Sequence, residues 1–309
     1  MTTLQDRLTG GEVVILDGAM GTELQRRGVP MDEVAWSAAA LKTHPDTVRG
    51  VHEDYIRAGA EIVITNTFAA VRHVLAPTGL GAEAAALNRR AVELAREARD
   101  RAGEGRPIWI AGSISNFNAG DDKASFPTPE AARANYREQA ESLADGGADL
   151  IMLEMMQDTE HSVYAAEAAA ATGLPVWVGF SCRIAEDGRT VVFRRREPET
   201  SLAEAFATVM ATGGSLAGVM HSDVAVVEPA LKVVFERWAG PVAAYPHSGH
   251  FVMPNWQFVD VIPPEDYAAE ARRWLDMGAQ VIGGCCGIGP DHIRLLKERL
   301  AGQSVPPRP

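Results

Sequence analysis

Residues 45–66, with the sequence PDTVRGVHEDYIRAGAEIVITN, contain one complete unit of a pattern that recurs along the whole chain. Pro45–Ala58 is typical of a helix, and a proline in the first turn favours helix initiation. Gly59 follows, and glycine readily adopts the left-handed conformation that ends a helix. The β-branched run Ile62–Asn66 then predicts a short strand that ends in a polar residue. The segment therefore predicts a helix, a tight turn and a strand in succession.

The same alternation of strands and helices extends over nearly the whole chain. Eight apolar, β-branched runs predict strands: Val13–Asp17, Ile62–Asn66, Ile108–Ser113, Leu150–Glu154, Val176–Cys182, Leu216–His221, Val242–Tyr245 and Val281–Cys286. Eight helical patterns accompany them: Pro45–Ala58, Ala82–Ala102, Pro129–Asp145, Asp158–Ala171, Ser201–Thr212, Val226–Trp238, Pro264–Met277 and Pro290–Leu300. This alternation implies βαβ units and a parallel sheet.

Eight βα units are the number that closes a (β/α)8, or TIM, barrel. An open doubly wound sheet is the alternative, but it needs a glycine-rich phosphate turn after its first strand. The segment 17–22, DGAMGT, matches that turn poorly. We therefore predict the α/β class and a single-domain (β/α)8 TIM barrel over residues 1–302. A flexible, proline-rich tail is expected at residues 303–309.

Composition and charge exclude several classes of partner. The 309-residue chain carries a net charge of −12 and is 46% hydrophobic. Its basic residues are scattered apart from Arg194–Arg196, which we interpret as a solvated loop, so neither nucleic acid nor an anionic membrane is expected as a partner. No stretch approaches the ~20 apolar residues of a membrane span, and Val13–Leu16 is too short for a secretory segment. With only three cysteines, the chain is expected to be a reduced, cytoplasmic protein.

The ends of the predicted strands carry the chemistry, because a barrel places them on one face. Polar, titratable or sulfur-bearing residues end all eight strands: Asp17, Asn66, Ser113, Glu154, Cys182, His221, Tyr245, and the pair Cys285 and Cys286. Glycines on both sides of Cys285-Cys286 let the backbone bend closely around the two sulfurs. Two thiolates suit Zn²⁺, which also accepts imidazole nitrogen. The alternative is that both cysteines pack as small hydrophobic residues.

Several motifs together resemble those of a known family. Residues 17–24, DGAMGTEL, resemble the opening motif of the homocysteine S-methyltransferases. That family includes the betaine- and S-methylmethionine-dependent enzymes and the homocysteine domain of cobalamin-dependent methionine synthase. The resemblance continues, in order, at Trp36-Ser37-Ala38, Pro45-Asp46-Thr47-Val48, His52, Tyr55, Ala58-Gly59-Ala60, Thr65-Asn66-Thr67-Phe68, Phe180-Ser181-Cys182, Tyr245-Pro246 and Gly283-Gly284-Cys285-Cys286-Gly287.

The resemblance implies a zinc-bound homocysteine thiolate that takes a methyl group and becomes methionine. In the family, the two cysteines of the Gly-Cys-Cys motif bind zinc together with a third cysteine in a Gly-Val-Asn-Cys context. The sequence here is Gly218-Val219-Met220-His221, so the third position is histidine. We expect His221, Cys285 and Cys286 to form a catalytic Cys₂His zinc site. The alternatives are a changed acceptor or a demethylase role, or a metal-free binding barrel.

The resemblance also assigns substrate-binding residues. Asp17 and Glu154 are expected to hold the amino group of homocysteine, with Glu23 in the same pocket. Asn66 would hydrogen-bond the substrate carboxylate or the donor. Tyr245 is a candidate aromatic wall for a cationic donor, as are Phe117 and Trp256. Roles for His247 and His250 stay open, whereas Cys182 is expected to pack and Asp223 to lie in solvent.

One barrel leaves no room for folate or cobalamin domains. The expected partners are therefore homocysteine or a related thiol and a small methyl donor. S-methylmethionine, S-adenosylmethionine, a betaine and dimethylsulfoniopropionate are the candidate donors. Members of the family often self-associate, so a homo-oligomer is compatible with the resemblance.

Overall fold

The computed structural model describes residues 3–118, 126–194, 199–252 and 257–305. Eight strands form one sheet in which every neighbouring pair is parallel. They are β1 (Val14–Ile15), β2 (Ile62–Ile64), β3 (Trp109–Ser115), β4 (Leu150–Met156), β5 (Val176–Phe180), β8 (Leu216–Asp223), β9 (Val242–His247) and β12 (Val281–Ile282). Their order is β1-β12-β9-β8-β5-β4-β3-β2.

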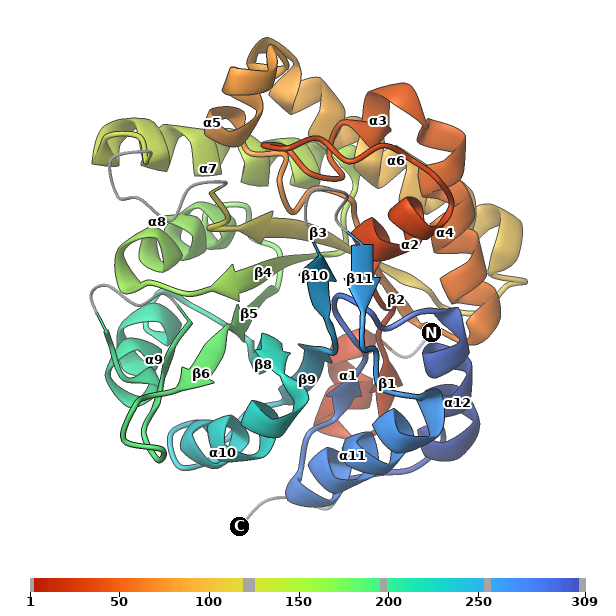
Figure 1. The fold of residues 1–309 in the computed structure, drawn as a ribbon, viewed down its shortest axis with the longest axis vertical. Helices are drawn as coiled ribbons and strands as arrows, with labels where there is room; N and C mark the ends of the chain where they lie inside the picture. The colour runs from red at the N-terminus through yellow and green to blue at the C-terminus, as the bar shows by residue number, and fades with distance from the viewer. Residues whose placement is uncertain (1–2, 119–125, 195–198, 253–256, 306–309) are drawn as a thin grey trace.

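The sheet closes on itself between its first and last strands. Leu16 pairs with Ile62 in a parallel bridge, and the Asp17 amide donates to the Ile62 carbonyl at 3.0 Å. The predicted (β/α)8 barrel is therefore confirmed, and Figure 1 shows the helices outside the ring of strands. Apolar side chains such as Trp177 and Met152 fill the barrel interior. A second apolar layer lies between the strands and the surrounding helices.

Eight longer helices surround the barrel. They are α4 (Pro45–Ala58), α6 (Ala84–Ala102), α7 (Pro129–Gly146), α8 (Thr159–Ala170), α9 (Leu202–Met210), α10 (Val224–Phe235), α11 (Pro264–Met277) and α12 (Pro290–Leu300). Four of these helices start with proline: α4, α11 and α12 have the predicted bounds, and α7 ends one residue later than predicted. Proline fixes the backbone of the first turn, so the sequence marks these starts sharply.

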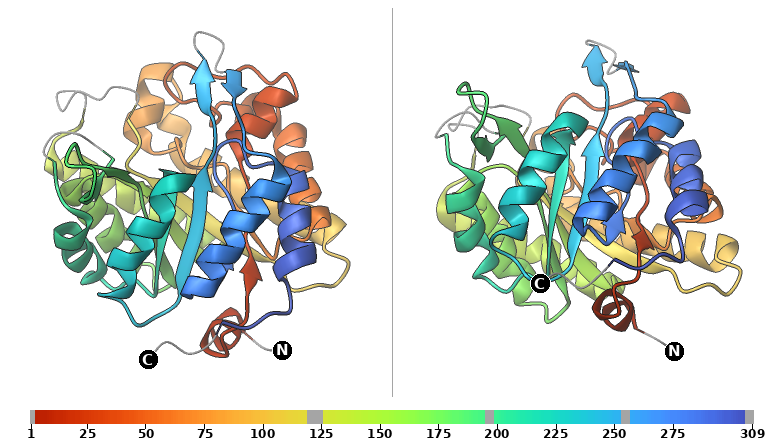
Figure 2. Two further views of the ribbon diagram at one scale, coloured as in Figure 1. Left: turned by 60° about the horizontal axis from the view of Figure 1, so that its bottom comes forward. Right: turned by 90° about the horizontal axis from the view of Figure 1, so that it is seen from below.

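Short elements make up the remainder of the described chain. Six are helical: α1 (Leu4–Thr9), α2 (Met20–Arg26), α3 (Ala40–Thr43), α5 (Arg72–Leu75), η1 (Ala76–Thr78) and η2 (Gly81–Glu83). Two antiparallel hairpins pair β6 (Cys182–Ile184) with β7 (Val191–Phe193), and β10 (His250–Val252) with β11 (Gln257–Val259). The β10–β11 hairpin projects at the end of the barrel opposite the two termini (Figure 2). Among the described residues, no helix is long and apolar enough to cross a membrane.

The start of the expected C-terminal tail packs against the barrel. The Val13 amide donates to the Gln303 carbonyl at 3.1 Å, and the Val305 amide donates to the Gly11 carbonyl at 2.8 Å. Val305 is only 7% exposed. The prediction of a fraying tail is thus wrong for residues 303–305, because paired backbone groups and a buried side chain fix them. Residues 306–309 lie outside the described part.

Candidate metal centre and substrate cavity

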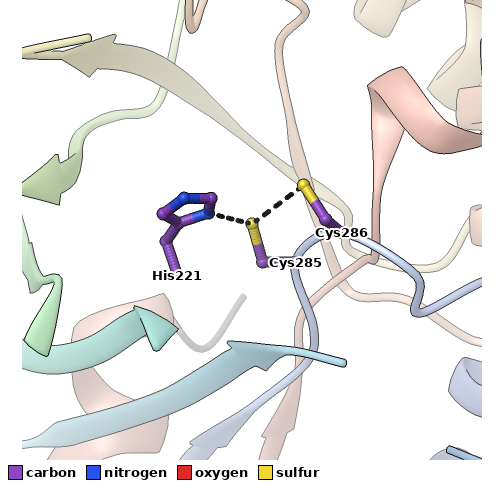
Figure 3. Close-up of side chains that lie close together, drawn as sticks. All are labelled: His221, Cys285 and Cys286. Carbon is purple, nitrogen blue, oxygen red and sulfur yellow. Dashed lines mark hydrogen bonds between the residues drawn. The ribbon is translucent and has the colours of Figure 1, made fainter. Parts of the chain in front are cut away.

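His221, Cys285 and Cys286 come together at the C-terminal end of the strands (Figure 3). The Cys285 Sγ lies 3.6 Å from His221 Nδ1 and 3.9 Å from Cys286 Sγ. All three potential ligand atoms lie within 4.8 Å of one another. The structure therefore gathers the three predicted metal ligands in one place, although His221 and Cys285 are 64 residues apart in the sequence.

The backbone around His221 is irregular. The β8–β9 register shifts between Met220 and Asp223, and His221 has a φ of 43°. A non-glycine residue rarely adopts this left-handed conformation, which turns the imidazole away from the regular strand direction. The Ser181 hydroxyl fixes the turn by donating to the His221 carbonyl at 2.7 Å. A β-bulge at the strand end thus aims the imidazole at the two cysteines.

The cysteine pair is held by the neighbouring loop after β9. The Cys285 amide donates to the Pro246 carbonyl at 2.8 Å, and the Ser248 amide donates to the Cys286 carbonyl at 3.0 Å. Gly287 follows with a φ of 84°, and a β-carbon there would lie 2.2 Å from the Ser248 carbonyl oxygen. Only glycine fits this turn without displacing the loop.

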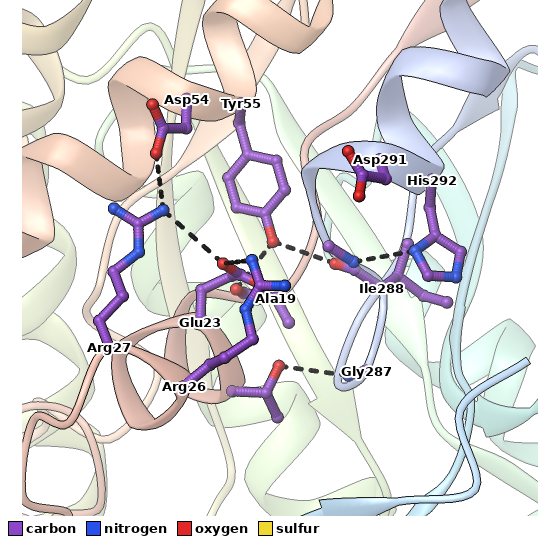
Figure 4. A network of polar contacts seen from close by, with 12 residues as sticks. Ala19, Glu23, Arg26, Arg27, Asp54, Tyr55, Gly287, Ile288, Asp291 and His292 are labelled. Carbon is purple, nitrogen blue, oxygen red and sulfur yellow. Dashed lines mark hydrogen bonds and ion pairs between the residues drawn. The ribbon is translucent and has the colours of Figure 1, made fainter. Parts of the chain in front are cut away.

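Tyr55 braces the cysteine loop from the other side (Figure 4). Its buried hydroxyl lies 2.9 Å from the Ala19 carbonyl and 3.0 Å from the Ile288 carbonyl. The Ala19 amide also donates to the Ile288 carbonyl, at 2.9 Å. Helix α4 thereby ties the loop after β1 to the loop that carries both cysteines.

The cluster borders a cavity of about 370 Å³. Aromatic side chains form one part of its lining: Trp36, Phe68, Phe117 and Phe258. The Phe68 ring packs 5.5 Å from Phe117 and 6.5 Å from His221, between centroids. The aromatic wall therefore faces the candidate metal centre. Phe117 was predicted for this role, whereas Trp256 lies outside the described residues.

Glu154 is the buried acid of the cavity, as predicted. Its carboxylate accepts a hydrogen bond from the Ser113 hydroxyl. Burial raises the pKa of Glu154 to about 7, despite the opposing effect of that hydrogen bond. Such a group ionises readily when a cation enters the site.

Asp17 lies beneath the cavity floor and is 1% exposed. Its carboxylate accepts the Ile64 amide at 2.8 Å through one oxygen, while the other has no partner among the described residues. Burial raises the pKa of Asp17 well above its usual range, and the charge of Glu154 adds to the effect. Asp17 is thus close enough to Glu154 to influence the same ligand group.

Asn66 lines the cavity but its amide is already engaged. Its side-chain nitrogen donates to the Ser37 carbonyl at 2.9 Å, and its oxygen accepts the Ser37 hydroxyl at 2.8 Å. These bonds attach the loop after β2 to the segment that carries Trp36. The predicted contact between Asn66 and substrate therefore stays a prediction.

Glu23 and Tyr245, like Asp17, were predicted to bind substrate but do not line the cavity. Glu23 points toward the start of α12 and forms ion pairs with Arg26 at 2.7 Å and Arg27 at 3.6 Å. Glu23 stands at the end of the first turn of α2, whereas Met20 and Gly21 at the start of that turn border the cavity. Tyr245 is 2% exposed and packs in the barrel interior. Because β9 continues to His247, the residue two positions further along the same face reaches the cavity instead.

His247, left unassigned by the sequence, lies beside the candidate metal centre. Its ring centroid is 5.0 Å from that of His221. Its Nε2 lies 2.8 Å from the Asp223 carboxylate, and this hydrogen bond lowers the pKa of Asp223. Asp223 is 67% exposed, as expected for a residue in solvent, but it orients His247 rather than His221. His250 is exposed and lies 3.5 Å from Asp260.

Two further expectations concern Cys182 and the arginine run. Cys182 is fully buried and lies outside the cavity lining, so it packs as predicted. Arg194, predicted to lie in a solvated loop, is half-buried and lines the cavity. The short β6–β7 hairpin returns the chain to the barrel mouth, and no periodic sequence signal marks strands of three residues.

The three residues fit a zinc ion in both chemistry and spacing. Tetrahedral zinc with ordinary bond lengths separates two sulfurs by about 3.8 Å and a sulfur from an imidazole nitrogen by about 3.6 Å. The Cys285–Cys286 and Cys285–His221 separations are 3.9 Å and 3.6 Å, and the third pair, Cys286 and His221, lies within 4.8 Å. Burial, with the nearby His247 and Arg194, lowers the pKa of His221 well below its usual range, so the imidazole is neutral, as a metal ligand requires. Three protein ligands leave a fourth position for substrate.

Comparisons with known proteins agree with this geometry. The homocysteine S-methyltransferase family model matches residues 14–300. Selenocysteine methyltransferase of Astragalus bisulcatus is 30% identical, over 95% of this chain and 94% of that protein. Homocysteine S-methyltransferase of Escherichia coli (strain K12) is 32% identical, over 93% of this chain and 95% of its own.

A solved structure gives the same result in three dimensions. The metallated form of the homocysteine methyltransferase MmuM from Escherichia coli superposes with a TM-score of 0.78 at 29% identity. The match covers 96% of this chain and 99% of that one. The family model matches nearly the whole chain, the relatives match over nearly their full length, and the solved structure shares the fold. The chain is therefore a methyltransferase that belongs to the homocysteine S-methyltransferase family.

Proposed function

We propose that this protein transfers a methyl group from a small onium donor to the sulfur of homocysteine, giving methionine, with zinc bound by His221, Cys285 and Cys286. The observation that carries the proposal is the cluster of these three residues at the edge of a cavity that also contains a buried acid and an aromatic wall. When bound, zinc would keep the acceptor sulfur ionised at neutral pH.

The acceptor's ammonium group is assigned to Glu154, with Asp17 below it. Both carboxyl groups are buried, and burial raises both pKa values, so each gains from a cation that enters the site. An ammonium beside Glu154 would lower the pKa of that carboxyl and favour a charge-assisted hydrogen bond. The acid therefore anchors one end of the amino acid while its sulfur extends to the cysteine pair.

The donor is assigned to the aromatic side of the cavity. A sulfonium or quaternary ammonium group is attracted to the faces of aromatic rings, and Phe68 lies opposite His221. The transfer is an in-line displacement: the acceptor sulfur forms a bond to the methyl carbon while the donor's carbon–heteroatom bond breaks. The electron pair of that bond leaves on the donor, which departs as a neutral sulfide or amine.

The acceptor is the least constrained part of the proposal. Two relatives, from Astragalus bisulcatus and Brassica oleracea, are named selenocysteine methyltransferases, and the cavity here has Met155 at its wall and His247 near the candidate metal centre. A changed acceptor, a selenol among them, is therefore the alternative to homocysteine. A demethylase role or a metal-free barrel would follow if no acceptor were methylated or no metal bound.

The test combines metal analysis with a direct assay. Purified protein is expected to contain about one zinc per chain by inductively coupled plasma mass spectrometry. It is then incubated with homocysteine or selenocysteine and with each of S-methylmethionine, S-adenosylmethionine, betaine and dimethylsulfoniopropionate, and products are identified by mass spectrometry. Absence of stoichiometric zinc together with no methylated thiol or selenol would contradict the proposal.

Cytoplasmic location and self-association stay predictions. All three cysteines are free, as a reducing compartment requires. Size-exclusion chromatography with light scattering measures the oligomeric state directly.

A further inference from the structure

Arg194 stands at the cavity with an incompletely used guanidinium group. It follows β7, and its amide donates to the Ser181 carbonyl at 2.8 Å. Its side chain is half-buried, and Nη1 lies 3.4 Å from the His221 carbonyl oxygen. No ion pair of Arg194 occurs among residues 3–118, 126–194, 199–252 and 257–305. A guanidinium has five N–H donors, and within the described part of the chain one long hydrogen bond leaves most of them available to a ligand.

The neighbouring carboxylate, that of Asp223, does not pair with the Arg194 guanidinium. The charge of Arg194 helps to lower the pKa of Asp223, after the larger effect of the hydrogen bond from His247. Asp223 is therefore near enough to sense Arg194, but one of its two carboxylate oxygens is bonded to His247 at 2.8 Å, and no ion pair joins Asp223 to Arg194 in the described part of the chain. An anion supplied by a ligand would complete the coordination of the guanidinium in a partly desolvated site.

Arg194 and Glu154 both line the cavity. Glu154 lies in β4, and the Arg194 amide bonds to the Ser181 carbonyl just after β5, the strand that pairs with β4. The charge of Arg194 acts on His221 and Asp223. The cavity is thus lined by an acid, a guanidinium and aromatic rings.

We propose that Arg194 binds the carboxylate of the methyl donor and so selects donors that carry both an onium centre and a carboxylate. This inference rests on the proposed function. The carboxylate is assigned to the donor because Arg194 contacts the His221 carbonyl, beside the centre at which the methyl group is transferred, whereas the proposed function places the acceptor's ammonium, with the carboxylate on the same carbon, at Glu154. A donor with several bonds between its two charges can instead place its onium group near Phe68 and its carboxylate on Arg194.

The guanidinium also suits the reaction that follows. Methyl loss removes the positive charge of the donor, while its carboxylate keeps its partner. The demethylated product therefore loses its attraction to the aromatic wall and retains only the Arg194 contact. Planar, two-bond recognition of a carboxylate is a property of arginine that lysine does not reproduce.

Binding of two matched probes to the zinc-loaded protein tests the inference without turnover. Dimethylsulfoniopropionate carries a sulfonium and a carboxylate, whereas trimethylsulfonium carries the sulfonium alone. Isothermal titration calorimetry is expected to show tighter binding of the first probe to the natural protein. Arg194→Gln should weaken that probe by about tenfold to hundredfold and leave trimethylsulfonium unchanged. Arg194→Lys should lie between the two.

Arg183→Gln is the matched control. Arg183 lies on the same hairpin, pairs with Glu199 at 2.6 Å and does not line the cavity, so neither probe should change its affinity. Equal effects of Arg194→Gln on both probes would give Arg194 a structural role through the His221 carbonyl and overturn the inference. No effect on either probe, or no binding of dimethylsulfoniopropionate to the natural protein, would also overturn it.

Turnover separates this inference from the proposed function. In the methylation assay, Arg194→Gln should raise KM for the carboxylated donor and change kcat by a few fold at most. If the natural protein methylates no acceptor, the proposed function fails, and the calorimetry still decides whether Arg194 binds the carboxylate.

Discussion

His221 has a strained backbone conformation at a position that is predicted to bind a metal ion. Its φ of 43° resembles that of Met155, which has a φ of 52° and also lies at a register shift in the barrel. Such conformations cost roughly 1–3 kcal/mol and persist where the surrounding structure enforces them. Both residues border the cavity. The barrel therefore uses bulges at two strand ends to orient side chains that a regular strand would direct elsewhere.

His221 variants test metal ligation at the level of one atom. His221→Ala should reduce zinc content well below one per chain, because two cysteines alone leave two positions open. His221→Cys should retain zinc, since a thiolate restores a third ligand of the kind found in the family. The measurement is zinc per chain after dialysis, with circular dichroism as a check of folding. Full zinc retention by the alanine variant would show that His221 is not a ligand.

Glu154 should make the metal-free protein less stable as the pH rises. Its pKa in the folded state is about 7, above the 4.5 of the free side chain, so the folded state favours the protonated form. That stabilisation is complete below pH 4.5 and is lost as the pH rises through 7. Between pH 5 and pH 8, the natural protein should lose about 2 to 3 kcal/mol relative to Glu154→Gln.

Urea unfolding of both metal-free proteins at the two pH values measures this difference directly. The Gln variant keeps the hydrogen bond to Ser113 but cannot ionise, which makes it a matched reference. A gap between the two proteins that does not depend on pH would show that Glu154 is not the titrating group.

At the level of elements, helix α4 reaches two loops from outside the barrel. Tyr55 contacts the Ala19 and Ile288 carbonyls with one hydroxyl, which joins the loop after β1 to the loop that carries both cysteines. A helix that belongs to the scaffold thus determines how far the cysteine loop can move. The candidate metal centre is therefore supported by α4 as well as by β12.

Tyr55→Phe should therefore affect stability and metal retention together. Removal of the buried hydroxyl should lower the free energy of unfolding by about 1 to 2 kcal/mol. It should also increase the rate of zinc loss to a chelator severalfold. Tyr136→Phe is the control, because Tyr136 is equally buried but its hydroxyl contacts His161, outside the cavity lining. Equal zinc loss from both variants would contradict the bracing role.

At the scale of the whole molecule, the sequence predicted the scaffold better than the details of the mouth. All eight barrel strands were predicted, because buried β-branched runs are a strong sequence signal. Helices bounded by proline and glycine, such as Pro45–Ala58, were predicted to the residue. The hairpins β6–β7 and β10–β11 were missed, because three-residue strands have too few residues for a periodic pattern. Arg194 was misplaced for the same reason.

The site shows the same division. Cys285, Cys286 and His221 were predicted as a cluster, because strand ends converge in any closed barrel and because the family resemblance implies metal ligands at these three positions. Tyr245 and Glu23 were wrong as cavity residues, since depth along a strand and the face of a short helix depend on where each element ends. Asp223 is bonded to His247, a pairing that depends on the side-chain geometry after a bulge.

Residues at the amino-terminal end of the barrel strands should affect the stability of the protein and not its catalytic activity. Val305 is buried beside the start of β1, where its amide bonds to the Gly11 carbonyl. This is the amino-terminal end of the strands, which in barrels of this kind serves stability rather than chemistry. Val305→Asp should lower the free energy of unfolding by about 3 kcal/mol, because it buries a charge without a partner. Zinc content and kcat at 25 °C should stay unchanged.

Val252→Asp is the control for Val305→Asp, because Val252 is 43% exposed and its substitution should change stability by less than about 0.5 kcal/mol. Urea unfolding and the methylation assay are measured on the same samples. If Val305→Asp impaired turnover while the protein remained folded and zinc-loaded, the two ends of the barrel would be coupled. If it left stability unchanged, the contacts of Gln303–Val305 with Gly11 and Val13 would contribute nothing to barrel closure.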